Sequence, residues 1–107
     1  MLKLSMEFSN ESCFFINENV AYVKDKLKDQ YNIIFLDSDD EADKDNKIFI
    51  AKGSSYYIWQ LLVEDKNYGD ILSNLSELFD PFGEQEISQV DSFLNQIIDR
   101  GFIKCKS

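Results

Sequence analysis

Glycine and proline divide the second half of the chain into three segments, and this division limits the possible folds more than any other feature of the sequence. Both residue types interrupt regular structure, glycine through its unusual backbone angles and proline through its missing N–H donor. Each segment repeats apolar residues with the period of a helix, so we expect helices over residues 54–64, 68–79 and 84–100. The interrupting residues are Gly53, Gly69, Gly83, Gly101 and Pro81.

The ends of these segments carry helix-boundary signals. Asn67 and Asp70 stand where a capping pair would stand at the start of the second segment. That segment ends before Pro81, because the residue preceding a proline is pushed out of helical conformation. In the third segment Arg100 lies in the last turn, where a positive charge complements the helix dipole. These signals support three separate helices.

The first half has the composition of β-strands. Residues 20–23, 31–36 and 47–51 are rich in β-branched and aromatic side chains, and the acidic stretch 37–46 separates the last two. We therefore expect an antiparallel hairpin with a long tip. Residues 102–105 are expected either to form a short strand or simply to cover the core.

This order of elements predicts an α+β fold in which a three-stranded antiparallel N-terminal sheet packs on a C-terminal three-helix bundle, in a winged-helix-like arrangement. With 107 residues the chain has the length of one domain. We expect that domain over residues 20–107, with the sheet in 20–52 and the helices in 54–100. Residues 1–19 are set apart as an N-terminal extension.

Charge argues against nucleic acid as a partner. The chain has 20 acidic and 11 basic residues and a net charge of −9. Nucleic acid is bound largely through neutralisation of its phosphates by Lys and Arg, and anionic membranes also attract basic proteins. Between Gly53 and Gly101 the chain has nine acidic residues against Lys66 and Arg100. We expect neither DNA binding nor membrane binding, despite the winged-helix-like order.

The sequence lacks the residue type that serves catalytic and metal sites most often. The sequence has no histidine, which removes the usual general base and the commonest metal ligand. Cys13 and Cys105 do not have a zinc-binding spacing and are expected to be free thiols. An EF-hand loop starting at Asp37 or Asp39 would lack both its glycine and its final glutamate. We expect no catalysis by this chain alone, no metal and no cofactor.

The N-terminus shows no apolar core of a signal peptide, and no apolar stretch approaches the ~20 residues that span a bilayer. We therefore expect a cytoplasmic protein.

The hydrophobic spacing between residues 31 and 103 resembles that of the PqqD-like family. The residues that carry the resemblance are Ile58-Trp59-Gln60-Leu61-Leu62, Tyr68-Gly69-Asp70-Ile71, Leu75, Phe79, Val90, Phe93-Leu94, Ile97 and Gly101-Phe102-Ile103. The resemblance implies a stand-alone RiPP recognition element, that is, a non-catalytic peptide chaperone in the biosynthesis of ribosomally made natural products. Such a domain binds the leader of a precursor peptide and presents it to a modifying enzyme such as a radical-SAM protein, a protease or a cyclase.

The resemblance also implies where the leader binds. It would add as a further strand along the third strand, and it would rest against the third helix. The side chains of Ile48 and Ile50 should then share one face of that strand. The peptide-binding residues expected on the strand are Lys47, Ile48, Phe49, Ile50 and Ala51. Those expected on the helix, where each residue could equally serve only the core, are Val90, Phe93, Leu94 and Ile97.

The net charge of −9 would steer a leader with basic residues toward the protein. Residues 1–19 and the acidic stretch 37–46 have no clear counterpart in the family. A different class of function remains open, an acidic protein-interaction module of the immunity or anti-regulator type.

Overall fold

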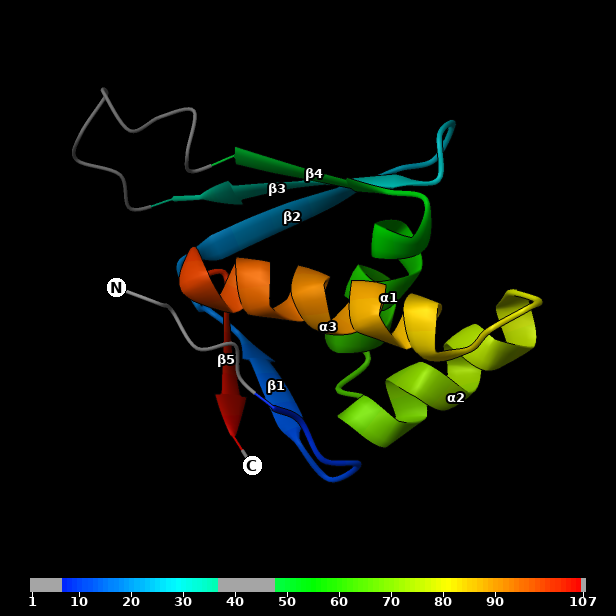
Figure 1. The fold of residues 1–107 in the computed structure, drawn as a ribbon. Helices are drawn as coiled ribbons and strands as arrows, with labels where there is room; N and C mark the ends of the chain where they lie inside the picture. The colour runs from blue at the N-terminus through cyan, green and yellow to red at the C-terminus, as the bar shows by residue number, and fades with distance from the viewer. Residues whose placement is uncertain (1–6, 37–47, 107) are drawn as a thin grey trace.

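The computed structural model describes residues 7–36 and 48–106, and within them the strands precede the helices except for one strand that follows them (Figure 1). The α+β class expected from the sequence is confirmed. The elements in chain order are β1 (Cys13–Ile16), β2 (Val20–Asp25), β3 (Gln30–Phe35), β4 (Ile48–Lys52), α1 (Ser54–Val63), α2 (Tyr68–Leu78), α3 (Glu84–Asp99) and β5 (Ile103–Lys106).

The expected three-stranded antiparallel sheet is confirmed, with the strand order β2-β3-β4. Its register places Ile33 of β3 opposite Tyr22 of β2 and Phe49 of β4. The short connection between β2 and β3 is fixed locally, because the carboxylate of Asp25 accepts a hydrogen bond from the N–H of Leu27 at 2.9 Å. The helices pack on one face of this sheet (Figure 1).

A second sheet, which the sequence pattern does not predict, consists of β1 and β5 paired antiparallel. Phe14 of β1 lies opposite Cys105 and is only 4% exposed, so it belongs to the core. The sequence pattern places residues 13–16 in the N-terminal extension because four residues show no clear periodicity and their partner strand lies at the far end of the sequence. Of the two alternatives for residues 102–105 the short strand is confirmed, since β5 begins at Ile103, and Phe102 before it is buried in the core.

The helices lie where the periodicity predicts them, each ending one residue earlier than expected. At the start of α2 the side chain of Asn67 accepts a hydrogen bond from the N–H of Asp70 at 2.8 Å, which confirms the predicted cap. Gly101 follows α3 with a φ of 82°, a left-handed conformation that favours glycine and turns the chain into β5.

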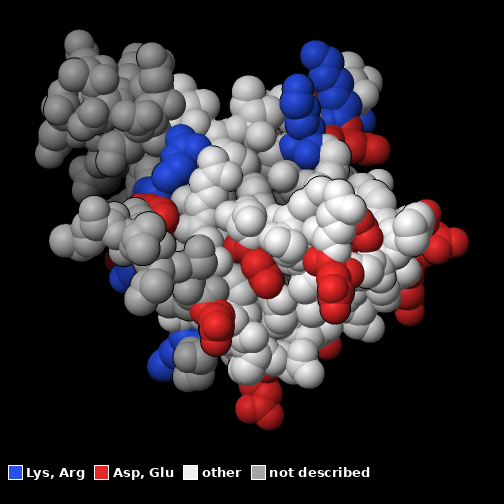
Figure 2. Space-filling view, in the orientation of Figure 1, with Lys and Arg blue, Asp and Glu red and all other residues white. Residues whose placement is uncertain are grey.

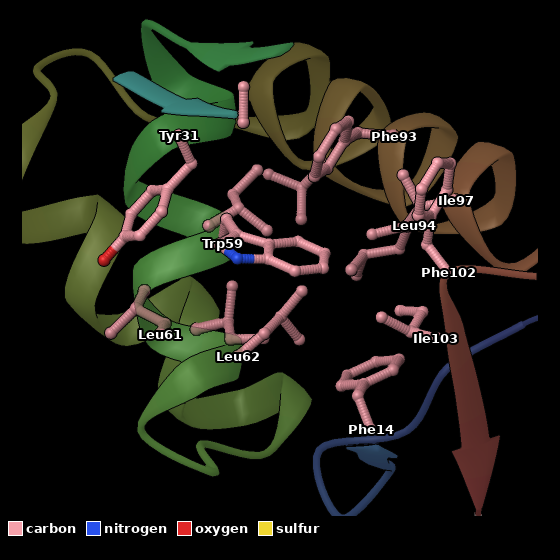
Figure 3. Packing of buried hydrophobic residues seen from close by; sticks show 14 of the residues in the cluster. Phe14, Tyr31, Trp59, Leu61, Leu62, Phe93, Leu94, Ile97, Phe102 and Ile103 are labelled. Atoms are coloured by element: carbon pink, nitrogen blue, oxygen red, sulfur yellow. The ribbon is translucent and has the colours of Figure 1, made fainter. Parts of the chain in front are cut away.

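The core lies between the three-stranded sheet, the helices and the β1–β5 ribbon. Trp59 of α1 has no exposed surface and lies between side chains of α1 and those of α3 and β5 (Figure 3). Its ring meets that of Tyr22 edge-on at 5.8 Å, which ties α1 to the sheet. Phe102 and Ile103 close the core next to Phe14 (Figure 3).

If β1 belongs to the core, removing its buried ring should destabilise the protein strongly. We expect Phe14→Ala to lower the free energy of unfolding by about 3–5 kcal/mol, because it leaves a cavity in a packed core. Phe15→Ala is the matched control, since Phe15 is the next residue of the same strand and is 50% exposed. Urea unfolding followed by circular dichroism measures both, and equal small losses would show that β1 adds little to the fold.

Candidate functional site

Strand β4 forms one edge of the three-stranded sheet. Among the described residues it pairs only with β3, so its other side has no neighbouring strand. An edge strand exposes backbone N–H and C=O groups that can pair with a further strand. The strand that the sequence analysis selected for peptide binding is therefore an edge, although Lys47 lies outside the described residues.

The hydrogen-bond alternation of antiparallel sheets tells which residues of β4 present their backbone at the edge. The N–H of Leu36, the residue after β3, donates to the carbonyl of Asn19, the residue before β2, at 2.8 Å. Successive residues of a central strand direct their backbone groups to opposite neighbours. The even-numbered residues of β3 therefore bond to β2 and the odd-numbered ones to β4. Given the register of β3 and β4, we infer that Phe49 and Ala51 bond to β3. The backbone groups of Ile48, Ile50 and Lys52 then point outward.

A side-chain contact agrees with this assignment. The carbonyl of Ile48 accepts a hydrogen bond from the guanidinium Nη2 of Arg100 at 3.1 Å, and Arg100 follows α3 outside the sheet. A carbonyl directed at β3 could not be reached from there. The backbone at the edge is thus approachable from the side on which α3 lies.

The two faces of β4 have different roles. Ala51 is completely buried and Phe49 is partly buried against the core, whereas Ile48 and Ile50 are 41% and 51% exposed. The expectation that Ile48 and Ile50 share a face is confirmed, and this is the face away from the helices. A peptide strand added at the edge would continue both faces, with alternate side chains toward the helices and toward the outside.

Phe49 connects the edge to the third helix. Its ring lies 5.5 Å from that of Phe93 in α3 and 6.0 Å from that of Phe102. The guanidinium of Arg100 lies 5.6 Å from the same ring, within the range of a cation–π contact. Both the backbone and the ring of Phe49 therefore serve the fold, which limits what Phe49 can offer a peptide.

The four residues expected on α3 divide into two pairs. Leu94 and Ile97 have no exposed surface and lie in the core, so they present nothing to a peptide in this structure. Val90 and Phe93 are also largely buried, but both line a pocket. For Leu94 and Ile97 this burial favours the alternative that the residue serves only the core.

The pocket, of about 460 Å³, opens where β4 turns into α1. Its walls are mostly apolar and its rim is polar, which is the usual composition of a ligand pocket. The α2–α3 connection contributes two aromatic rings that the sequence analysis did not select, because their convergence depends on the packing of three helices. The lining residues are Ser54, Ser55, Ile58, Leu75, Phe79, Asp80, Pro81, Phe82, Glu86, Gln89, Val90 and Phe93.

A hydrogen bond between α2 and α3 supports the helices that wall this pocket. The hydroxyl of Tyr68, at the start of α2, donates to the carboxylate of Asp91 in α3 at 2.5 Å. Burial, and then this hydrogen bond to a carboxylate, raise the pKa of Tyr68 far above its ordinary value. The folded protein thus favours the neutral form of the Tyr68 phenol, which donates the hydrogen bond to Asp91.

The two cysteines are free and lie across the β1–β5 ribbon. Cys13 pairs with Lys106, whereas Cys105 pairs with Phe14, so strand alternation places the two thiols on opposite faces of the ribbon. Burial raises the pKa of the Cys105 thiol. Within residues 7–36 and 48–106 no group of three His, Cys, Asp or Glu side chains could hold a metal ion.

No helix in the part of the chain that the structure describes combines the length and the apolar character needed to cross a membrane. Comparisons with family models, with curated proteins and with solved structures gave no match. The likeness to the PqqD-like family therefore rests on the residue pattern of the sequence.

The raised pKa of Tyr68 predicts a loss of stability at alkaline pH. The unfolded chain would release the phenolic proton near pH 10, whereas the folded protein retains it, so the stabilisation is complete below about pH 10 and falls as the pH rises further. Urea unfolding at about pH 8 and about pH 11 should show a smaller alkaline loss for Tyr68→Phe than for the wild type. An equal loss in both proteins would contradict this role of Tyr68.

The hydrogen-bond alternation predicts losses of stability of different size for proline at neighbouring positions of β4. Proline has no N–H, so Phe49→Pro removes a bond to β3 and should cost more than about 2 kcal/mol of unfolding free energy. Ile50→Pro removes only an outward N–H and should cost about 1 kcal/mol or less. Urea midpoints of the two variants measure this difference, and the reverse order would show that the assignment of the edge is wrong.

Proposed function

We propose that this protein is a non-catalytic peptide chaperone that binds the leader of a ribosomally synthesised precursor peptide and presents it to a modifying enzyme. The observation that carries the proposal is the edge of β4, which no described strand covers, beside α3 and a largely apolar pocket. This is the arrangement that the resemblance to the PqqD-like family implies. The proposed binding mode is the addition of a leader strand to β4, as in other proteins that capture extended peptides.

The backbone of the edge supplies affinity that does not depend on the peptide sequence. A peptide strand would exchange hydrogen bonds with Ile50 and Lys52, whose N–H and C=O groups point outward, and with the N–H of Ile48. Each backbone hydrogen bond contributes about 0.5–1.5 kcal/mol net. These bonds hold the leader in an extended conformation and leave selection among sequences to side chains.

The pocket supplies selection. Side chains of the added strand that point toward the helices would approach α3 beside Phe93, which lines the pocket and also contacts Phe49. A volume of about 460 Å³ accommodates a large apolar side chain such as Leu or Phe. Burying one contributes about 1.5–3 kcal/mol, so an apolar residue at the matching leader position would be preferred.

The acidic surface favours a second candidate function. In the view of Figure 2 the acidic side chains are spread over the helices. An acidic interaction module of the immunity or anti-regulator type would use this surface on a basic partner protein, and it would not need the β4 edge. The two functions thus differ in which surface a mutation must alter.

Titration of labelled leader peptides tests the proposal. Candidate leaders come from short precursor genes beside the gene for this protein, and fluorescence anisotropy measures their affinity. Ile50→Pro should weaken binding at least about tenfold, because it removes a backbone donor at the centre of the edge. Lys24→Pro is the matched control, since the same alternation places the backbone of Lys24 at the opposite, β2 edge of the sheet.

The pocket is tested separately. Gln89→Trp places a large ring at the pocket rim and should also weaken binding about tenfold. Ser88→Trp makes the same change one residue earlier, at an exposed position of α3 that does not line the pocket, and should have little effect. Leaders that bind the Ile50→Pro and Gln89→Trp proteins as tightly as the wild type would contradict the proposal.

A further inference from the structure

Two positively charged side chains stand at the two ends of the β4 edge. Arg100 donates to the carbonyl of Ile48 at 3.1 Å, and its guanidinium lies over the ring of Phe49. Lys52 is the last residue of β4 and is exposed. Between these ends Ile50 is 51% exposed, so an apolar stretch of the edge is bracketed by positive charge.

The Lys52 end of the sheet carries further positive charge. The connection from β2 to β3 reaches this end, because Gln30 of β3 pairs with Lys52. Residues 24–30 contain three lysines against two aspartates. In the view of Figure 2 Lys and Arg side chains form a group at the upper right and another at the upper left, each with acidic side chains next to it, and most of the other acidic side chains lie over the helices. Among the described residues, the side chains at the two ends of the edge, Arg100 and Lys52, are thus positive although the chain as a whole is negative.

The charges nearest to a bound strand decide its preference. Salt screens interactions between exposed charges beyond about 8 Å at physiological ionic strength. Arg100 and Lys52 lie directly at the edge, whereas the net charge of −9 is summed over the whole chain. A net negative charge would steer a basic peptide toward the protein, but the contacts at the edge favour acidic side chains.

The same charges oppose pairing with a second copy of the chain. If β4 paired antiparallel with β4 of another molecule around Ile50, each Lys52 would lie opposite Ile48 of the other copy and hence beside its Arg100. Like charges that face each other across a ladder are destabilising, and lysine on an edge strand is a common protection against edge-to-edge association. Pairing between the β4 edges of two copies of the chain is thus disfavoured.

Strand alternation fixes where acidic residues of a bound peptide would lie. A residue opposite Phe49 points toward the helices, where Arg100 lies over the Phe49 ring. A residue opposite Lys52 points to the outer face, as the Lys52 side chain does. These positions are three residues apart, and the two residues between them lie opposite Ile50 and Ala51, where apolar side chains fit.

We propose that Arg100 and Lys52 select bound strands in which two acidic residues bracket two apolar ones. This selection rests on the proposed binding of a peptide strand along β4. The pattern of acidic, apolar, apolar and acidic residues reads the same in both directions, so it holds for parallel and antiparallel peptides. It defines the class of leader that the protein takes.

A selection from a library of short random peptides displayed on their own mRNA tests the proposal. The wild type should enrich peptides with acidic residues three positions apart around two apolar residues. The double variant Arg100→Gln/Lys52→Gln should lose this enrichment. The double variant Lys104→Gln/Lys106→Gln, which removes two positive charges from β5, should keep it.

The enriched peptides allow a test that leaves the protein unchanged. Replacing both acidic residues by their amides should weaken binding about fivefold to tenfold, as expected for two partly exposed ion pairs. The difference should disappear in about 1 M NaCl, where the screening length falls to about 3 Å. The single variant Lys52→Gln repeats the binding measurement with Arg100 and its contacts to β4 unchanged. Lys52 is exposed at the end of its strand, so this substitution should not affect folding.

The outcomes separate this inference from the proposed function. Two outcomes overturn the charge selection and leave strand addition intact. In the first, the enriched peptides lose affinity for Ile50→Pro but show no preference for acidic residues. In the second, the double variant Arg100→Gln/Lys52→Gln enriches acidic residues as strongly as the wild type does. Enriched peptides that bind Ile50→Pro as tightly as the wild type overturn strand addition itself. A selection that enriches no peptide above background contradicts both.

Discussion

The packing of Phe49 against Phe93 and Phe102 is the interaction on which the candidate site depends. It holds an edge strand beside a helix through a side chain that points inward, and it leaves the outward backbone groups uncovered by any described strand. A strand anchored through its edge instead would have used the hydrogen-bonding groups that a peptide needs. The aromatic contact therefore keeps β4 fixed and its edge open at the same time.

The alternation of β4 divides its residues between the fold and the edge. Phe49 and Ala51 bond to β3 and turn their side chains to the core, whereas Ile48, Ile50 and Lys52 present both backbone and side chain to the outside. This division explains why neighbouring residues should respond so differently to substitution. Arg100 lies at the Ile48 end of this edge and Lys52 at the other end, so a positive charge stands on each side of the apolar residue Ile50.

Sequence reasoning predicted the elements whose signals are local and missed those that depend on distant partners. The helices were predicted closely, because a turn of helix is stabilised by residues three and four positions apart and marked by caps such as Asn67. Strand β1 was missed, because its four residues acquire a role only by pairing with β5. The pocket was missed for the same reason, since Phe79 and Phe82 meet Ile58 only when the helices pack.

The amino-acid sequence by itself determined the α+β class and the succession of a three-stranded sheet and three helices, since these follow from periodicity and from residues that interrupt it. The choice of β4 as the candidate site came from the resemblance to the PqqD-like family. Only the tertiary structure decided which backbone groups of β4 face outward and that Leu94 and Ile97 are wholly buried. It also decided that Arg100 reaches Ile48 from the end of another element. Periodicity indicates which residues share a face of a helix or strand. Which element packs against that face depends on contacts between segments far apart in the chain.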